Sequence, residues 1–327
     1  MNIGILSFAH VHAEHYQALL KATPGVNFVG YWDDGPEAGL YASLYGIRQF
    51  DTPEALLAEV EGVVVCSETS RHLEFVKLAA QSGVHVLCEK PIATTVQDAE
   101  AMRDICENYG VRFMTAFPMR FDPTLVNLRE RLTAQELGTV LGVNGINHSE
   151  NPTHHRKWFG DPAQSGGGAV IDHVVHLVDL VRWAFQTEVQ SVYASIQWQM
   201  DPYKLDTGGL LLLNLQNRVQ VSIDCSWSRP SSYPRWGHFK LEVIGEEGVL
   251  FIDPFADHMT VYGKNTPATW MGFGPDPIQG MLDAFVDAVK KGEQPAVGWQ
   301  DGFETLRVIQ AVYESDRTGQ PVELRPL

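Results

Sequence analysis

The chain has 327 residues, 44% hydrophobic and 20% charged, a balance typical of a globular protein too long for one ordinary core. Its 24 basic residues against 40 acidic ones give a formal charge of −16, which argues against a nucleic-acid backbone as partner. No apolar stretch approaches the ~20 residues of a membrane span, and the first residues enter a strand without a basic leader, so we expect a cytoplasmic protein.

In the first third of the chain, predicted strands alternate with predicted helices. Strands are expected at 2–8, 26–32, 62–67, 84–90 and 111–117. Helices are expected at 12–22, 37–46, 52–60, 70–83 and 96–110. This alternation indicates βαβ units and a parallel sheet. We therefore expect an α/β protein whose residues 1–120 form a doubly wound, Rossmann dinucleotide-binding domain.

After Pro118 the predicted elements change, because strands follow one another without helices between them. Helices are expected at 123–138, 165–185, 277–292 and 299–319. Strands are expected at 139–150, 189–199, 208–216, 218–228, 238–253 (a hairpin turning at 245–248) and 259–263. This order predicts an α+β domain over 121–327 with a largely antiparallel open sheet. Its exposed apolar runs predict a homodimer or homotetramer, so the domain is assigned to substrate binding and oligomerisation.

The stretch SFAHVHA after the first strand stands where a dinucleotide-binding domain carries three glycines, but Ser7, Ala9 and His12 occupy those positions. His10 and His12 also form an H-x-H pair, as at the start of many metal hydrolases. A metal site of that kind needs further ligands from later strand ends and eight βα units, whereas the second half of this chain is rich in strands. Asp33 follows at about the 20-residue offset of a ribose-binding acid. We interpret the stretch as an altered dinucleotide loop and expect no metal site.

Two other stretches carry candidate catalytic groups. Glu89 and Lys90 end a predicted parallel strand, and open α/β sheets bind ligands at such ends. On the helix that follows the glycines of 166–168, Asp172 and His176 are four positions apart and share one face. A carboxylate beside an imidazole holds its tautomer, as a general base requires.

Three motifs occur in order along the chain: GVHVLCEKPIA (83–93), FPMRFDP (117–123) and GGGAVIDHVVHLVDLVRW (166–183). With them the chain resembles, over nearly its whole length, the glucose–fructose oxidoreductase / inositol dehydrogenase / rhizopine-catabolism (Gfo/Idh/MocA) family. The resemblance implies an NAD-dependent oxidoreductase that transfers a hydride from a secondary alcohol of a sugar, polyol or related hydroxy compound.

The resemblance also implies roles for particular residues. His176 would remove the hydroxyl proton, Asp172 would stabilise the imidazolium, and Lys90 would stabilise the alkoxide. Predicted cofactor contacts are Ser7, Phe8, Ala9, His10, His12, Asp33, Ser67, Thr69, His72, Glu89 and Lys90. Predicted substrate contacts are Arg120, Arg156, Trp158, Asp172 and His176.

Three further expectations concern cofactor choice and competing functions. Asp33 and Asp34 together should repel a 2′-phosphate, so NAD is predicted over NADP. The altered glycine pattern leaves a second hypothesis, a catalytically silent member that binds a nucleotide or sugar in a regulatory or scaffolding role. A metal-dependent hydrolase is the third hypothesis.

Overall fold

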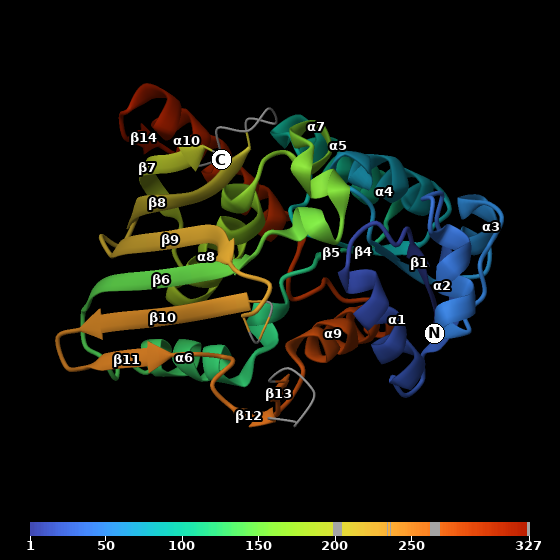
Figure 1. Cartoon of the computed structure of the whole chain (residues 1–327), viewed down its shortest axis with the longest axis horizontal. Helices are drawn as coiled ribbons and strands as arrows, with labels where there is room; N and C mark the ends of the chain where they lie inside the picture. The colour runs from blue at the N-terminus through green and yellow to red at the C-terminus, as the bar shows by residue number, and fades with distance from the viewer. Residues whose placement is uncertain (199–204, 234, 236, 262–268, 326–327) are drawn as a thin grey trace. The chain divides into compact units, whose positions relative to one another are not determined.

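The computed structural model describes residues 1–198, 205–233, 235, 237–261 and 269–325 of the chain (Figure 1). The chain divides into two compact units. Unit 1 comprises Met1–Phe117, Thr153–Gly166 and Ile278–Leu306, and unit 2 comprises Pro118–Pro152, Gly167–Pro277 and Arg307–Leu327. The first break lies close to the expected one after residue 120. Two later segments nevertheless pack with the first 117 residues. A prediction with one domain boundary does not include such returning segments.

Unit 1 is built on a five-stranded parallel sheet in the order β2-β1-β3-β4-β5. The strands are β1 (Asn2–Leu6), β2 (Asn27–Trp32), β3 (Gly62–Val65), β4 (His85–Cys88) and β5 (Phe113–Thr115). All of β3 is buried, as expected for a parallel strand covered on both faces. In this order the chain leaves β1 in one direction and β3 in the other, so the loops after β1 and β3 lie at the switch point where such sheets bind ligands.

The helices of unit 1 follow the predicted alternation. They are α1 (His12–Ala22), α2 (Ala38–Tyr45), α3 (Pro53–Leu57), α4 (His72–Gln81) and α5 (Val96–Tyr109), with the 3₁₀ turn η1 (Thr69–Arg71) before α4. Later segments add η3 (Pro152–His154), η4 (Lys157–Gly160), α7 (Pro162–Ser165) and α9 (Pro277–Lys291). Helix α10 (Trp299–Thr318) starts in unit 1 and ends in unit 2. The short η4 and α7 were not predicted, because no apolar period marks them.

Unit 2 is built on a seven-stranded sheet in the order β11-β10-β6-β9-β8-β7-β14. The strands are β6 (Val140–Glu150), β7 (Val189–Trp198), β8 (Asp206–Leu215), β9 (Gln220–Arg229), β10 (Gly237–Gly245), β11 (Val249–Ile252) and β14 (Val322–Glu323). Only the β6–β9 pair in this sheet is parallel, so the largely antiparallel α+β prediction is confirmed. The predicted hairpin is present between β10 and β11.

Helix α8 (Ala169–Phe185) packs on one face of this sheet, against β6, β8 and β9 (Figure 1). The helix α6 (Pro123–Thr133) packs on α8, and the 3₁₀ turn η2 (Pro118–Phe121) precedes α6. The strands β12 (His258–Val261) and β13 (Thr269–Gly272) form a separate antiparallel pair. The predicted strand at 259–263 therefore extends in part beyond the described residues. Across the part of the chain that the structure describes, no helix is long and apolar enough to cross a bilayer.

Candidate functional site

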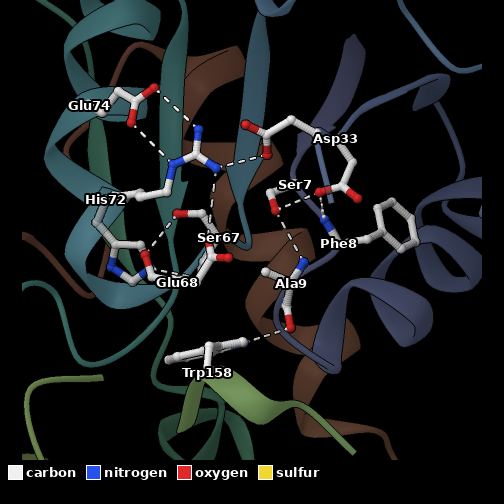
Figure 2. Close-up of polar contacts among 11 residues, drawn as sticks. Ser7, Phe8, Ala9, Asp33, Ser67, Glu68, His72, Glu74 and Trp158 are labelled. Atoms are coloured by element: carbon white, nitrogen blue, oxygen red, sulfur yellow. Dashed lines mark hydrogen bonds and ion pairs between the residues drawn. The ribbon is translucent and has the colours of Figure 1, made fainter. Parts of the chain in front are cut away.

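The loop between β1 and α1 is held by side chains where glycines were expected. Ser7 adopts the left-handed conformation (φ 69°) that a glycine would accept without strain. Its hydroxyl donates to Asp33 Oδ1 at 2.8 Å, and the backbone N–H of Phe8 donates to the same oxygen at 3.1 Å (Figure 2). The N–H of Ala9 in turn donates to Ser7 Oγ at 3.1 Å. The loop is thereby tied to the end of β2.

The start of α1 is capped by a histidine of the same loop. The N–H of His12 donates to His10 Nδ1 at 3.2 Å, and the N–H of His10 donates to the carbonyl of Cys66 at 2.8 Å. Most N–H groups that a glycine loop would offer to a phosphate are therefore already engaged. Asp33 Oδ2, in contrast, makes no hydrogen bond to any residue that the structure describes. This oxygen at the end of β2 fits a ribose hydroxyl donor.

Three of the predicted cofactor residues meet in one cluster. The Glu89 side chain is fully buried, with His12 Nδ1 at 2.9 Å and His10 Nδ1 at 3.9 Å from its Oε1. Tyr16 donates its hydroxyl to the same oxygen, and the N–H of Lys90 donates to Oε2 at 3.1 Å. Burial alone would raise the pKa of the Glu89 carboxyl, but the two imidazoles and the hydrogen bonds outweigh it and hold that pKa well below its usual range.

The segment with Arg156 and Trp158 belongs to unit 1 and lies against the same loop. The indole N–H of Trp158 donates to the carbonyl of Ala9 at 2.9 Å (Figure 2). The Arg156 guanidinium donates to Glu14 on α1 at 2.6 Å. Trp158 therefore contacts the loop predicted to bind the cofactor, and Arg156 contacts the helix that follows this loop.

Two predicted cofactor residues have buried side chains. The ring of His72 is fully buried, with its nitrogens 3.1 Å and 3.3 Å from the carbonyls of Ile92 and Ser67. Burial lowers the pKa of this imidazole. The ring of Phe8 is buried between two tyrosine rings, each with its centroid at 4.7 Å. Both side chains support the loops from inside. Ser67 and Thr69 are also buried.

The predicted acidic pair at the end of β2 has a cationic neighbour. Arg71, at the end of η1, donates to Asp34 at 2.8 Å and to Glu74 at 3.2 Å. The charge of Asp34 is thus partly offset, and Asp33 is left as the carboxylate without a cationic partner in this part of unit 1.

The glycines before α8 make room for a distant carboxylate that caps the helix. A Cβ on Gly168 would lie 1.9 Å from the carbonyl oxygen of Asp206, and one on Gly167 would lie 2.1 Å from the hydroxyl of Tyr313. The buried Asp206 carboxylate accepts hydrogen bonds from the N–H groups of Gly168 (2.8 Å) and Val170 (2.7 Å) and from Tyr313 (3.0 Å). Sequence reasoning missed Asp206, because it lies far along the chain from the helix that it caps.

Helix α8 is buried along most of its length. Within Ala169–Arg182, Asp172 and His176 are the two residues that are not buried. Trp227 donates its indole N–H to Asp172 Oδ2 at 3.0 Å, which fixes this carboxylate. His173, the other histidine of this helix, is buried. The predicted acid–imidazole pair is therefore less buried than the residues around it on this helix.

Arg120 and Lys90 are both buried side chains. The guanidinium of Arg120 makes two hydrogen bonds to Asp179 on α8, at 2.6 Å and 2.8 Å, and both side chains are buried. This geometry gives Arg120 a structural ion pair in addition to any contact with substrate. Lys90 directly follows β4 in unit 1. Because Asp172 and His176 belong to unit 2, their meeting with Lys90 stays a prediction.

Comparisons with known proteins agree with this division of the chain. Residues 1–117 match the family model described as "Oxidoreductase family, NAD-binding Rossmann fold", and residues 125–251 match the "GFO/IDH/MocA C-terminal domain". Inositol 2-dehydrogenase 2 of Saccharopolyspora erythraea is 30% identical over 100% of this chain and 96% of its own length. D-xylose 1-dehydrogenase (NADP(+)) 2 of Haloferax volcanii is 30% identical over 99% of this chain and 100% of its own length.

Among solved structures, the fold is close to that of GenD2 from gentamicin A biosynthesis, crystallised in complex with NAD. The TM-score is 0.88 at 24% identity, over 100% of this chain and 97% of that one. The aldose-aldose oxidoreductase of Caulobacter crescentus, complexed with glycerol, gives a TM-score of 0.83 at 23% identity over 99% of both chains.

Proposed function

Because the chain belongs to the GFO/IDH/MocA oxidoreductase family, we propose that it transfers a hydride between NAD and a secondary alcohol or ketone of a sugar, polyol or related hydroxy compound. The named relatives act on inositol and on D-xylose, which supports this substrate class. The observation that carries the proposal is that Asp172 and His176 are the two residues not buried within Ala169–Arg182 of α8.

In this proposal the residues of the two units divide the work at the alcohol. His176 takes the hydroxyl proton, and Asp172, fixed by Trp227, stabilises the imidazolium that forms. The ammonium of Lys90 stabilises the developing alkoxide. The bound nicotinamide supplies the hydride acceptor. Its pyrophosphate would lie at the loop of residues 7–12, and its adenosine ribose would donate to Asp33 Oδ2.

We propose NAD over NADP on the balance of charge around this ribose site. Arg71 faces Asp34, Glu74 and, at 3.9 Å, Glu68, so one guanidinium meets three carboxylates, and Asp33 adds a fourth nearby. A 2′-phosphate would enter a region of net negative charge. One of the relatives is named for NADP, so a titration of both cofactors is the direct test. Tighter NADPH than NADH binding would contradict the preference.

The test of the proposed function is NADH formation with a panel of inositols and aldoses. We expect Lys90→Ala and His176→Ala each to lower kcat/KM by at least about 100-fold, because each removes a group that acts in the transition state. Lys77→Ala, which removes an exposed lysine from α4, is the matched control and should behave as wild type. Losses within about tenfold for Lys90→Ala and His176→Ala would contradict the assignment.

A catalytically silent binding protein is the second candidate function. It is favoured by the engagement of the loop N–H groups with Asp33, Ser7 and His10, which leaves fewer donors for a pyrophosphate. Binding of NAD by calorimetry without turnover of any substrate in the panel would support it over the dehydrogenase.

We also propose a homo-oligomer, in the cytoplasm. The sheet face of unit 2 opposite α8 exposes Tyr193 beside Leu212, and Leu210 on the same strand as Leu212. Exposed apolar area of this kind favours a subunit contact. The cysteines Cys66, Cys88, Cys106 and Cys225 are free and buried, which fits a reducing compartment. A monomer mass in light scattering would contradict the oligomer.

A further inference from the structure

We propose that His10, His12 and Glu89 form a binding site for one divalent transition-metal ion, of which Zn²⁺ is the best match. This site goes beyond the proposed function and does not depend on it. The H-x-H pair of the β1–α1 loop supplies two ligands. The end of β4 supplies the carboxylate, which is the strand-end ligand that the sequence pattern by itself lacked.

The spacing of the donor atoms supports this site. One ligand atom from each of the three residues lies within 4.8 Å of the others. Two nitrogens, His12 Nδ1 at 2.9 Å and His10 Nδ1 at 3.9 Å, face the same oxygen of Glu89. Ligands of a tetrahedral Zn²⁺ with bond lengths of about 2.0–2.1 Å lie roughly 3.4 Å apart, so the two distances bracket the required value.

The groups around the ligands orient them. Tyr16 and the N–H of Lys90 both donate to the Glu89 carboxylate, each to a different oxygen. Such outer contacts fix a ligand and raise metal affinity. The N–H of His12 donates to His10 Nδ1 in this structure, so an ion bound through that nitrogen exchanges one neutral hydrogen bond for a coordinate bond.

Exposure gives the site an entrance and an open position. The side chain of His12 is 31% exposed, whereas those of His10 and Glu89 are 4% and 0% exposed. An ion can therefore enter beside His12. Three protein ligands leave at least one coordination position of Zn²⁺ for water or for an oxygen of a small molecule.

The donor set defines which ions should bind. Two imidazoles and one carboxylate suit Zn²⁺, Co²⁺ and other late transition metals, whereas Mg²⁺ and Ca²⁺ prefer oxygen ligands alone. An ion here would also lie beside the loop of residues 7–12. His12, which stands where the third glycine of a dinucleotide loop is expected, thus serves as a metal ligand in this proposal.

The test is a calorimetric titration of the full-length protein, first treated with a chelator, with Zn²⁺ and then with Mg²⁺. We expect one Zn²⁺ per chain, no binding of Mg²⁺, and visible absorption of a nitrogen-ligated ion when Co²⁺ replaces Zn²⁺. His12→Ala, at the partly exposed position, should weaken Zn²⁺ binding by at least about 100-fold. Glu89→Gln should do the same. His15→Ala is the matched control, because His15 is an exposed histidine on the same helix, and it should bind Zn²⁺ as wild type does.

Absence of Zn²⁺ binding in the wild type, or unchanged binding in His12→Ala, would overturn the proposal. A folded His12→Ala protein, verified by circular dichroism, decides the question even if Glu89→Gln does not fold. No cofactor or alcohol is present in the titration. Failure of the metal site and failure of the dehydrogenase are therefore observed in separate experiments.

Discussion

Glu89 in unit 1 and Asp206 in unit 2 are both fully buried carboxylates, and each accepts a hydrogen bond from a tyrosine. Their pKa values nevertheless move in opposite directions. Burial raises the pKa of Asp206, and its hydrogen bonds oppose this shift without cancelling it. Burial acts on Glu89 in the same sense, but there the imidazoles of His10 and His12 reverse the outcome.

The two carboxylates differ in whether their partners can keep a buried carboxylate ionised. Among the residues that the structure describes, the Asp206 carboxylate accepts from neutral donors, namely two backbone N–H groups and a phenol. Glu89 meets two groups that can carry a positive charge. Neutral donors satisfy the oxygen atoms, whereas opposite charge also offsets the loss of hydration. Asp206 is accordingly suited to cap a helix. Glu89 is suited to bind a positive charge, either a protonated imidazole or the proposed metal ion.

The largest expected effect is at the helix cap of unit 2. Asp206→Ala leaves the N–H groups of Gly168 and Val170 and the hydroxyl of Tyr313 without their acceptor. Because these donors are buried or nearly so, we expect the free energy of unfolding to fall by about 3 kcal/mol or more. Urea denaturation of the full chain measures it.

The control for this variant is Asp122→Ala, which removes the local cap of α6. Asp122 accepts from the N–H groups of Thr124 (2.9 Å) and Leu125 (3.3 Å) and from the Thr124 hydroxyl, all within the first turn of α6, so the change should cost only about 1 kcal/mol. Equal losses for the two variants would mean that the distant cap is no more important than an ordinary local one.

The next effect is the opposite pH dependence of the two carboxylates. Because the folded-state pKa of Glu89 lies below its ordinary 4.5, the stability that Glu89 contributes is complete above pH 4.5 and is lost as the pH falls further. Because the folded-state pKa of Asp206 lies above its ordinary 3.8, stability is lost there as the pH rises from 3.8 through the folded pKa.

The measurement compares wild type with Glu89→Gln and with Asp206→Asn in unfolding experiments across the acidic range. The difference in the free energy of unfolding between wild type and Glu89→Gln should shrink toward low pH. The difference in the free energy of unfolding between wild type and Asp206→Asn should shrink toward neutral pH. Neither slope should exceed about 1.4 kcal/mol per pH unit, the limit for one proton. Slopes of the same sign would show that the two sites do not differ in the way proposed.

Local patterns were sufficient to predict the long helices and most of the strands, and to place Asp172 and His176 on one face of α8. The alternation of apolar strands and helices gave the parallel sheet of unit 1, and the consecutive strands gave the mixed sheet of unit 2. The i, i+4 spacing of Asp172 and His176 placed them on one face, since helix geometry alone determines which residues share it. These features depend on neighbours within a few residues.

Distant partners were not predictable, because they depend on which strand ends lie together. The cap of α8 joins Gly168 to Asp206, 38 positions away, and the cluster joins His12 to Glu89, 77 positions away. A usable signal existed for the second pair, since both residues follow parallel strands, whose ends share one edge of the sheet. No local signal identified Asp206, which simply begins a strand.

The smallest expected effect concerns a third carboxylate, Asp33, which is held by neutral donors as Asp206 is. Its hydroxyl donor, Ser7, has a φ of 69°. Ser7→Ala removes the hydroxyl and keeps the left-handed backbone, so we expect a loss of about 2 kcal/mol in the free energy of unfolding. Ser7→Gly removes the same hydroxyl but relieves the backbone, so its loss should be smaller by about 1 kcal/mol. Chemical denaturation of both variants measures the difference. A glycine variant less stable than the alanine variant would mean that the added freedom of the unfolded chain outweighs the strain at position 7. The serine would then be retained for its hydrogen bonds alone.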